Sequence, residues 1–265
     1  MKVYQQFLTR NSCFATGRAL TPIGVMVHST GANNPAVSRY VPGNEVLGVN
    51  KNGNHWDQSN AQWKEKFGVP LNKCVHAFIG KAADGSVVVV QTLPWDMRGW
   101  HAGMGAGNSR YIGFEICEDG LDDPEYCKAT YEAAVQLTAE LCSLFGLDPK
   151  KDGAVICHAE GFQRGVASNH GDVLHWWKLF GYDMDMFRRD VAAKMREEEE
   201  EMTQEQFDKM MDNWLARQAE KPVSDWAEKL LEEAKSRGIT DGTKPRAFAT
   251  REQVALMIRA AVYGN

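Results

Sequence analysis

The sequence predicts an α/β fold, with a mixed central β-sheet flanked by helices, and a small all-α module at its C-terminal end. Up to residue 195, short runs rich in β-branched and aromatic residues alternate with helical patterns, as in a layered α/β core. A run of five glutamates follows, and after it only helical patterns occur. We therefore expect a large domain at 1–195, a charged linker at 196–202 and a separate helical module at 203–265.

Five short apolar runs predict the strands of the sheet, because each is brief and dense in β-branched or aromatic residues. The second and third are separated by Ala-Ala-Asp-Gly, which predicts a hairpin turn. The five runs lie at 24–29, 76–81, 86–94, 111–118 and 154–158.

The clearest helix of the first domain is expected at 124–146. Pro124 suits its first turn, an apolar stripe runs along it, and Gly146 ends it. A second helix is expected at about 183–195, which follows the last predicted strand.

The tail should contain three more helices. The first spans 203–222 and the second 224–238, with Ser224 as N-cap and Gly238 just beyond the end. Thr250 caps the last one.

Composition describes a protein with a sizeable core and no strongly basic surface. The chain has 265 residues, 43% hydrophobic and 25% charged, with a net charge of −5. These values argue against non-specific nucleic-acid binding and against a polybasic membrane anchor. The six cysteines form no CxxC pair and are expected to be free thiols. The first residues lack the apolar segment of a signal peptide, so we expect synthesis in the cytoplasm.

One polar stretch, CHAEGFQRGVASNHGDVLHWW at 157–177, holds three histidines, a glutamate and an aspartate. Neither a core strand nor an amphipathic helix has this pattern. Three explanations are open: a metal site, a histidine acid/base centre, or a polar loop without chemistry.

Two histidines follow apolar runs, since His28 ends the run GVMV and His158 ends AVIC. A histidine at the end of a strand is more often an ordinary hydrogen-bonded residue, but strand ends are also rigid positions for metal ligands. His170 and Asp172 lie two residues apart, so an extended backbone would point both side chains to one side. Two histidines and a carboxylate would form an open, hydrolytic zinc site.

These motifs resemble the type-2 N-acetylmuramoyl-L-alanine amidases, zinc hydrolases of bacterial peptidoglycan that share a fold with peptidoglycan recognition proteins. The resemblance covers residues 20–190 and rests on ordered motifs, among them His28 in VMVHST, Glu115 in IGFEICE, and His158 with the later His-x-Asp. It implies that His28, His158 and Asp172 bind Zn²⁺.

The same resemblance implies roles for four further residues. Glu115 would position or deprotonate the attacking water, and His170 would stabilise the oxyanion of the tetrahedral intermediate. Trp100 and His101 of GWHAG would lie along the substrate groove. Apart from the resemblance, His76 is expected to have a structural or a groove-lining, substrate-binding role.

The third zinc ligand stays open at this stage. The gap of fourteen residues from His158 to Asp172 is longer than is common in the family, and Val173 stands where proline is usual. His170 and His175 are therefore alternatives to Asp172.

The implied reaction is hydrolysis of the amide bond between N-acetylmuramic acid and L-alanine. Zinc lowers the pKa of its bound water toward about 7 and polarises the carbonyl. A phage or prophage endolysin, which is made in the cytoplasm and later acts on the cell wall, fits these expectations. Two other functions stay open: a non-catalytic peptidoglycan-binding recognition module, and a host autolysin or recycling amidase.

The tail resembles a single S-layer-homology motif, in which a helix, the loop GITDGT and a second helix opened by TRE follow one another. Such modules bind cell-wall polymers, usually in sets of three. One copy alone implies weak binding. Wall binding through avidity, pairing with a second copy, and capping of the first domain therefore stay open.

Overall fold

The computed structural model describes residues 2–103, 105–200 and 204–263, and the chain divides into two compact units, Met1–Glu197 and Glu198–Asn265. Residues 201 and 202 of the expected linker lie outside the described residues, as do 203, 264 and 265 of the expected tail module. Within the described part of the chain, every helix is too short or too polar to span a bilayer.

The described part of the first unit contains one mixed sheet of six strands, with the order β1-β4-β3-β5-β2-β6. Among the strand pairs of the described residues, β3–β4 is the antiparallel one and the others are parallel. This arrangement confirms the predicted mixed sheet and hairpin, whose turn contains Gly85 at a φ of 82°. The strands are β1 (Val3–Gln5), β2 (Gly24–Ser29), β3 (Ala77–Lys81), β4 (Val87–Gln91), β5 (Tyr111–Ile116) and β6 (Val155–Cys157).

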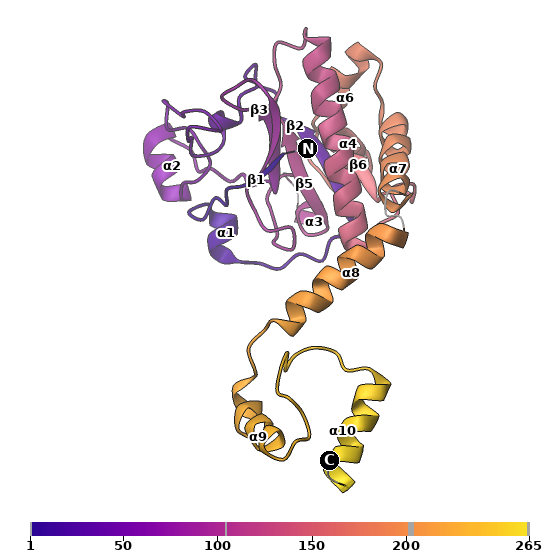
Figure 1. Ribbon diagram of the computed structural model, residues 1–265. Coiled ribbons are helices and arrows are strands. Elements are labelled where there is room, and N and C mark those ends of the chain that lie inside the picture. Colours follow the sequence, from indigo (N-terminus) through magenta and orange to yellow (C-terminus); the bar gives the residue numbers. More distant parts are fainter. Residues whose placement is uncertain (1, 104, 201–203, 264–265) are drawn as a thin grey trace. The chain divides into compact units, whose positions relative to one another are not determined.

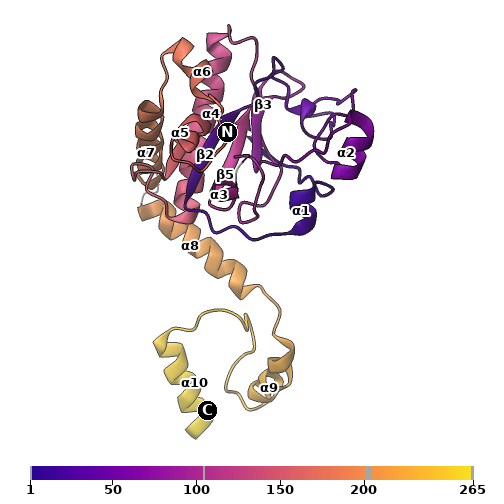
Figure 2. The ribbon, with the colours of Figure 1, turned by 180° about the vertical axis from the view of Figure 1, so that it is seen from behind.

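Two long helices lie on one side of the sheet, α4 (Pro124–Phe145) and α7 (Met184–Glu200). The segment with α1 (Ser12–Thr16) and α2 (Asn60–Phe67) lies on the other side, as the two opposite views show (Figures 1 and 2). The remaining short helices of this unit are η1 (Val37–Arg39), α3 (Gly105–Asn108), α5 (His158–Gln163), α6 (Leu174–Trp177) and η2 (Lys178–Phe180).

The capping residues expected for α4 are confirmed. Asp123 precedes the helix and its side chain accepts a hydrogen bond from the Tyr126 amide at 3.0 Å, Pro124 occupies the first turn, and Gly146 ends the helix at a φ of 63°. These residues satisfy amide groups that a helix end would otherwise leave without partners.

Strand alternation separates the main core from the opposite face of the sheet. Val25 and Val27 pack into the core that also contains α4, whereas Met26 belongs to a different cluster. Because successive strand residues point to opposite faces, His28 lies on the Met26 side, away from α4. The site is therefore built on the face that α4 leaves open.

The cysteines and the paired tryptophans behave as structural residues. All six cysteines are free, and five of them are buried, which confirms the expectation. Trp176 and Trp177 are fully buried in the main core beside Cys157. The polar stretch at 157–177 is therefore anchored to the main core by its own apolar residues.

The second unit is helical in its described residues. It contains α8 (Gln204–Ala219), α9 (Asp225–Ser236) and α10 (Arg251–Tyr263). Thr250 and Gln253 form a reciprocal cap at the start of α10, with bonds of 2.8 and 3.2 Å. The three helices expected in the tail are confirmed.

Candidate functional site

The site lies at the carboxyl ends of three parallel strands. β2 pairs in parallel with β5 on one side and with β6 on the other, and ligand sites of α/β sheets favour this edge. His28 is opposite Glu115 in the β2–β5 register, so the two side chains point to the same face. His158 directly follows β6 as the first residue of α5.

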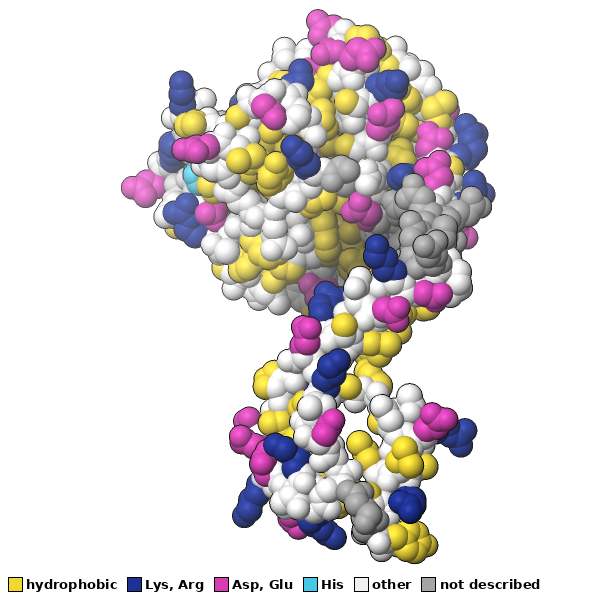
Figure 3. Space-filling model, in the orientation of Figure 1, with side chains coloured by type: hydrophobic (Ala, Val, Ile, Leu, Met, Phe, Trp, Pro, Cys, Tyr) yellow, Lys and Arg dark blue, Asp and Glu magenta, His cyan; other side chains and the backbone are white. Residues whose placement is uncertain are grey.

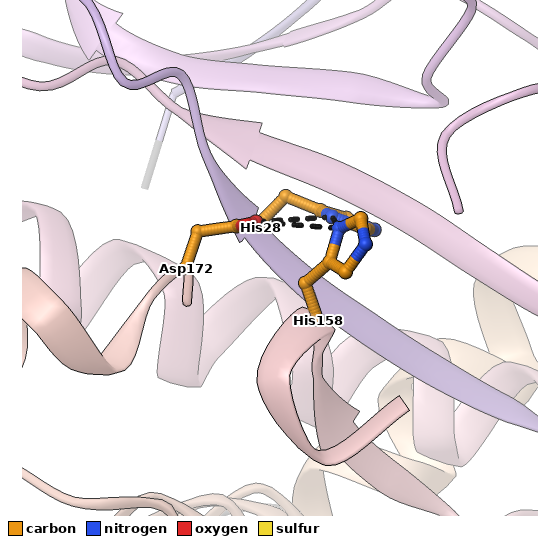
Figure 4. Close-up of side chains that lie close together, drawn as sticks. All are labelled: His28, His158 and Asp172. Carbon is orange, nitrogen blue, oxygen red and sulfur yellow. Dashed lines mark hydrogen bonds and ion pairs between the residues drawn. The ribbon is translucent and has the colours of Figure 1, made fainter. Parts of the chain in front are cut away.

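Three side-chain atoms converge at this edge (Figure 4). His28 Nδ1 is 2.9 Å from His158 Nδ1 and 3.3 Å from Asp172 Oδ2, and His158 Nδ1 is 3.6 Å from the same oxygen. Ligand atoms held tetrahedrally at about 2.0–2.1 Å from an ion lie about 3.3–3.4 Å apart. The three residues therefore have the spacing and the donor types of a metal site.

The hydrogen bond at His158 Nε2, the ring nitrogen that points away from His28 and Asp172, shows which ring nitrogen carries the proton. His158 Nε2 lies 3.0 Å from the Ser168 carbonyl oxygen. Because a carbonyl only accepts, Nε2 carries the proton and Nδ1 has a free lone pair. Burial, followed by the neighbouring His28, lowers the pKa of His158 to about 4. The ring is therefore neutral near pH 7 and can donate its lone pair to a cation.

The His28 ring contacts another histidine on its far side. His28 Nε2 is 2.9 Å from His101 Nδ1, and His101 Nε2 is 3.1 Å from the Tyr111 carbonyl oxygen. Burial, followed by the charges of His28 and His76, lowers the pKa of His101 well below its ordinary value. His101, predicted to lie along the substrate groove, does line it, but its ring nitrogens bind protein groups.

Of the three alternatives for the third ligand, Asp172 is the one whose side chain reaches the group. Burial would raise the pKa of Asp172, but the two neighbouring imidazoles, His28 before His158, outweigh it and lower that pKa. His175 Nε2 instead faces Glu118 Oε1 at 3.1 Å. His170 Nδ1 lies 3.3 Å from Nε2 of His158, which is the nitrogen turned away from the group.

Glu115 presents a buried carboxylate oxygen beside the group. Its Oε2 has no hydrogen-bond partner among the described residues. Burial, followed by the Asp172 carboxylate, raises the pKa of Glu115 well above its ordinary value. Since an unpaired buried carboxylate is costly, this oxygen calls for a cation or a water molecule that donates to it.

His158, Asp172 and Glu115 line a groove with a volume of about 550 Å³. Trp100 lines this groove and is 37% exposed, so its ring is accessible to a substrate. His170 also lines the groove.

Of the two roles expected for His76, structural or groove-lining, the contacts of this residue fit the structural one. It is fully buried, and both its ring nitrogens are engaged. Nδ1 accepts from the Gly113 amide at 3.0 Å, and Nε2 lies 2.8 Å from the Met97 carbonyl oxygen. The sequence left both roles open because a histidine before a strand looks the same in sequence whether it faces solvent or core.

An aromatic part of the groove lining was not predicted from the sequence. Trp63 and Phe67 stand one turn apart on α2, with ring centroids 4.3 Å apart. A signal for α2 was available, because Ser59 and Gln62 form a capping box and Gly68 ends the helix. Four aromatic side chains line the groove besides Trp100: Tyr40, Trp56, Trp63 and Phe67.

Comparisons with known proteins show which family and which solved structures the chain is similar to. The family model described as "N-acetylmuramoyl-L-alanine amidase" matches residues 18–172. Among solved structures, the hydrolase AmiA of Staphylococcus aureus, in complex with its ligand, is 20% identical in sequence to this chain. The match covers 74% of this chain and 83% of the AmiA chain, with a TM-score of 0.50. A mutant endolysin from Bacillus subtilis is 22% identical, with 72% and 99% covered and a TM-score of 0.43. No curated protein matches the chain in sequence.

Proposed function

The chain belongs to the N-acetylmuramoyl-L-alanine amidase family, whose model matches more than half of it, and from this premise we propose that it works as a zinc-dependent endolysin. It is an amidase of bacterial peptidoglycan, acting on the bond between N-acetylmuramic acid and L-alanine. The convergence of His28 Nδ1, His158 Nδ1 and Asp172 Oδ2 within 2.9–3.6 Å carries the metal part of the proposal.

The three residues fit zinc in their chemistry as well as in their spacing. Two neutral imidazoles and one carboxylate are typical of catalytic zinc sites, which keep one further position open. When bound, zinc acidifies a water molecule and polarises the carbonyl to be attacked. Two lone pairs and a carboxylate oxygen this close together also repel one another unless a cation or a proton lies between them.

Glu115 and His170 supply the remaining chemistry. The Glu115 carboxylate, on the strand position opposite His28, takes a proton from the attacking water and passes it to the leaving nitrogen. His170, exposed in the groove, opposes in its cationic form the negative charge that develops on the substrate oxygen. Groups in this role contribute about 2.7–4 kcal/mol.

An endolysin fits better than a non-catalytic recognition module. A non-catalytic recognition module has no need of a complete donor set beside a free carboxylate, and this chain has both. A host autolysin or recycling amidase shares the chemistry and differs in its target, because a recycling enzyme acts on soluble fragments whereas an endolysin acts on the intact wall.

On purified peptidoglycan, we expect the full-length chain to release new N-terminal alanine and no new reducing sugar ends. The reason is that an amide bond, not a glycosidic bond, is cleaved. Labelling the amino groups of the product and assaying reducing ends checks both. Reducing ends without N-terminal alanine would indicate a glycosidase, and binding without either product would indicate a recognition module.

We propose that the second unit associates with copies of itself. None of the described side chains at 204 and 207–263 is buried. The unit instead exposes apolar side chains along its helices (Figure 3), among them Trp214 on α8, Trp226 and Leu230 on α9, and Leu256 on α10. An exposed apolar surface of this kind indicates an interaction surface.

Charge favours a second copy of the chain over an anionic wall polymer as the partner. Residues 204–263 contain ten Lys and Arg and ten Asp and Glu, so this stretch has no net charge. A neutral module gains little from an anionic polymer and does not repel its own copy. Association would present several catalytic units to one wall, which strengthens binding to an insoluble substrate.

A chain that ends at Glu197 should cleave soluble muramoyl peptide at close to the full-length rate and lyse intact walls more slowly. The sequence suggests a cut near Ala193, but Met195 packs against the main core, so the cut belongs after it. The described site residues all lie upstream, and the tail acts only through avidity. Both rates are measured for both chains.

Light scattering provides the control for this prediction. The full-length chain should have a multiple of its monomer mass of 29.6 kDa, and the shortened chain should be a monomer. A monomeric full-length chain would refute self-association, and slower wall lysis would then point to direct polymer binding. Loss of activity on the soluble substrate would show that the tail belongs to the catalytic fold.

A further inference from the structure

We propose that His101 is a positioning residue that holds His28 in the one tautomer able to bind the metal. This inference rests on the proposed metal site and assigns to His101 a role other than substrate contact. Its basis is a chain of hydrogen bonds that begins at a backbone carbonyl and ends at the His28 nitrogen that faces His158 and Asp172.

The chain starts at Tyr111, whose carbonyl oxygen lies 3.1 Å from His101 Nε2. A carbonyl can only accept, so His101 Nε2 carries the proton and His101 Nδ1 carries the lone pair. His101 Nδ1 lies 2.9 Å from His28 Nε2, so His28 must donate from Nε2. The His28 Nδ1 lone pair is thereby left free, 2.9 Å from His158 Nδ1 and 3.3 Å from Asp172 Oδ2.

The position of His101 is fixed from two further directions. Asn108 Oδ1 accepts from the His101 amide at 2.6 Å and from the Ala102 amide at 2.8 Å, which fixes the backbone on which the ring is carried. The ring itself lies over Gly113 of β5, where a Cβ atom would overlap it. The geometry of the ring is therefore set by the protein before any ion arrives.

A histidine has a specific advantage at this place. The outer partner of a metal-bound histidine is usually a carboxylate, a backbone carbonyl or water, and such partners orient the ring and fix its tautomer. A neutral imidazole performs the same orientation without placing another negative charge behind the ligand. Since the site already contains the Asp172 carboxylate, the neutral partner leaves more of the ion's positive charge to act on the substrate.

Two variants of nearly the same shape test the proposal. His101→Asn retains an oxygen where Nδ1 stands and can still accept from His28, whereas His101→Leu has the same branched outline without an acceptor. Zinc affinity is measured for the full-length chain and both variants by competition with a chromophoric chelator. The tautomer of His28 is read from ring ¹⁵N shifts in metal-free protein at about pH 8, above the ordinary histidine pKa.

We expect His101→Leu to weaken zinc binding about 10–100-fold, as loss of such partners does, and His101→Asn to recover most of the affinity. In metal-free protein, His28 should be protonated at Nε2 in the parent and in His101→Asn, and should populate both tautomers in His101→Leu. Gly113→Ala, which displaces the ring without altering it, should resemble His101→Leu. Thermal unfolding establishes that each variant is folded at the temperature used.

Two results would overturn the proposal. One is a folded His101→Leu chain that binds zinc as tightly as the parent; the other is a His28 tautomer that is the same in all three chains. The tautomer measurement needs no metal. A parent that shows the Nε2–H tautomer but binds no zinc would therefore refute the zinc site while leaving the positioning role of His101 supported.

Discussion

Replacing Asp172 with alanine is expected to empty the metal site and abolish hydrolysis. Asp172 supplies a carboxylate oxygen that lies near both ligand histidines, at 3.3 and 3.6 Å. Without it, two neutral imidazoles hold the ion alone, and zinc should fall from about one per chain to a small fraction of that. Metal catalysis contributes several kcal/mol, and because 1.36 kcal/mol is tenfold in rate, about 4 kcal/mol corresponds to a loss of roughly 10³-fold.

Elemental analysis of the purified chain and turnover of a muramoyl peptide measure both effects. In the parent, a chelator should abolish activity and added Zn²⁺ should restore it. A metal-free preparation with full activity would refute the zinc mechanism.

His170→Ala and His175→Ala are the matched controls, because these histidines are the two alternatives to Asp172 as third ligand. His175 faces Glu118, so its loss should leave zinc content and turnover near those of the parent. His170→Ala should keep zinc and lose about 10²–10³-fold in kcat, as an oxyanion-stabilising group does. If His170→Ala empties the site and Asp172→Ala does not, the ligand assignment is wrong.

Glu115→Gln is expected to retain zinc and lose most of its turnover. Glutamine has nearly the shape of glutamate, so the groove should be unchanged, but an amide cannot accept and return a proton. Positioned acid/base groups contribute about 10²–10⁴-fold, and kcat should fall within that range. KM should change much less, since Glu115 acts in the transition state rather than in substrate binding.

Glu118→Gln is the control for this variant. Glu118 is also buried and lies three residues further along, yet its carboxylate faces His175 rather than the metal group. Turnover of Glu118→Gln should stay near that of the parent at a temperature where the chain is folded. Equal losses in both variants would mean that the general electrostatics of the groove, and not proton transfer by Glu115, limits the reaction.

Much of the fold was accessible from the sequence because its signals are local. Pro124 and Gly146 marked the ends of α4, the turn with Gly85 marked the hairpin, and Thr250 marked the start of α10, as the structure confirms. Each signal depends on residues a few positions apart, whose backbone conformations and caps are set by their immediate neighbours.

Two elements that the sequence did not predict, β1 and α2, lack a clear apolar pattern. β1 is three residues long and exposes Val3, so neither length nor alternation marks it as a strand. α2 buries no residue and therefore has no apolar stripe, although its Trp63 and Phe67 line the groove.

The site residues also fall into two sets, those that the sequence indicated and those that only the tertiary structure brings together. The sequence by itself singled out His28 and His158 as histidines that end apolar runs, and its resemblance to the amidase family added Glu115. The placement of Asp172 rather than His170 or His175 beside the two histidines came only from the tertiary structure, which anchors the loop through the Ala159 amide and the Asp172 carbonyl at 3.1 Å. The contact of His101 with His28 also came from the structure alone. Both depend on strand order and register, which join residues up to 144 positions apart and which no pattern of neighbouring residues encodes.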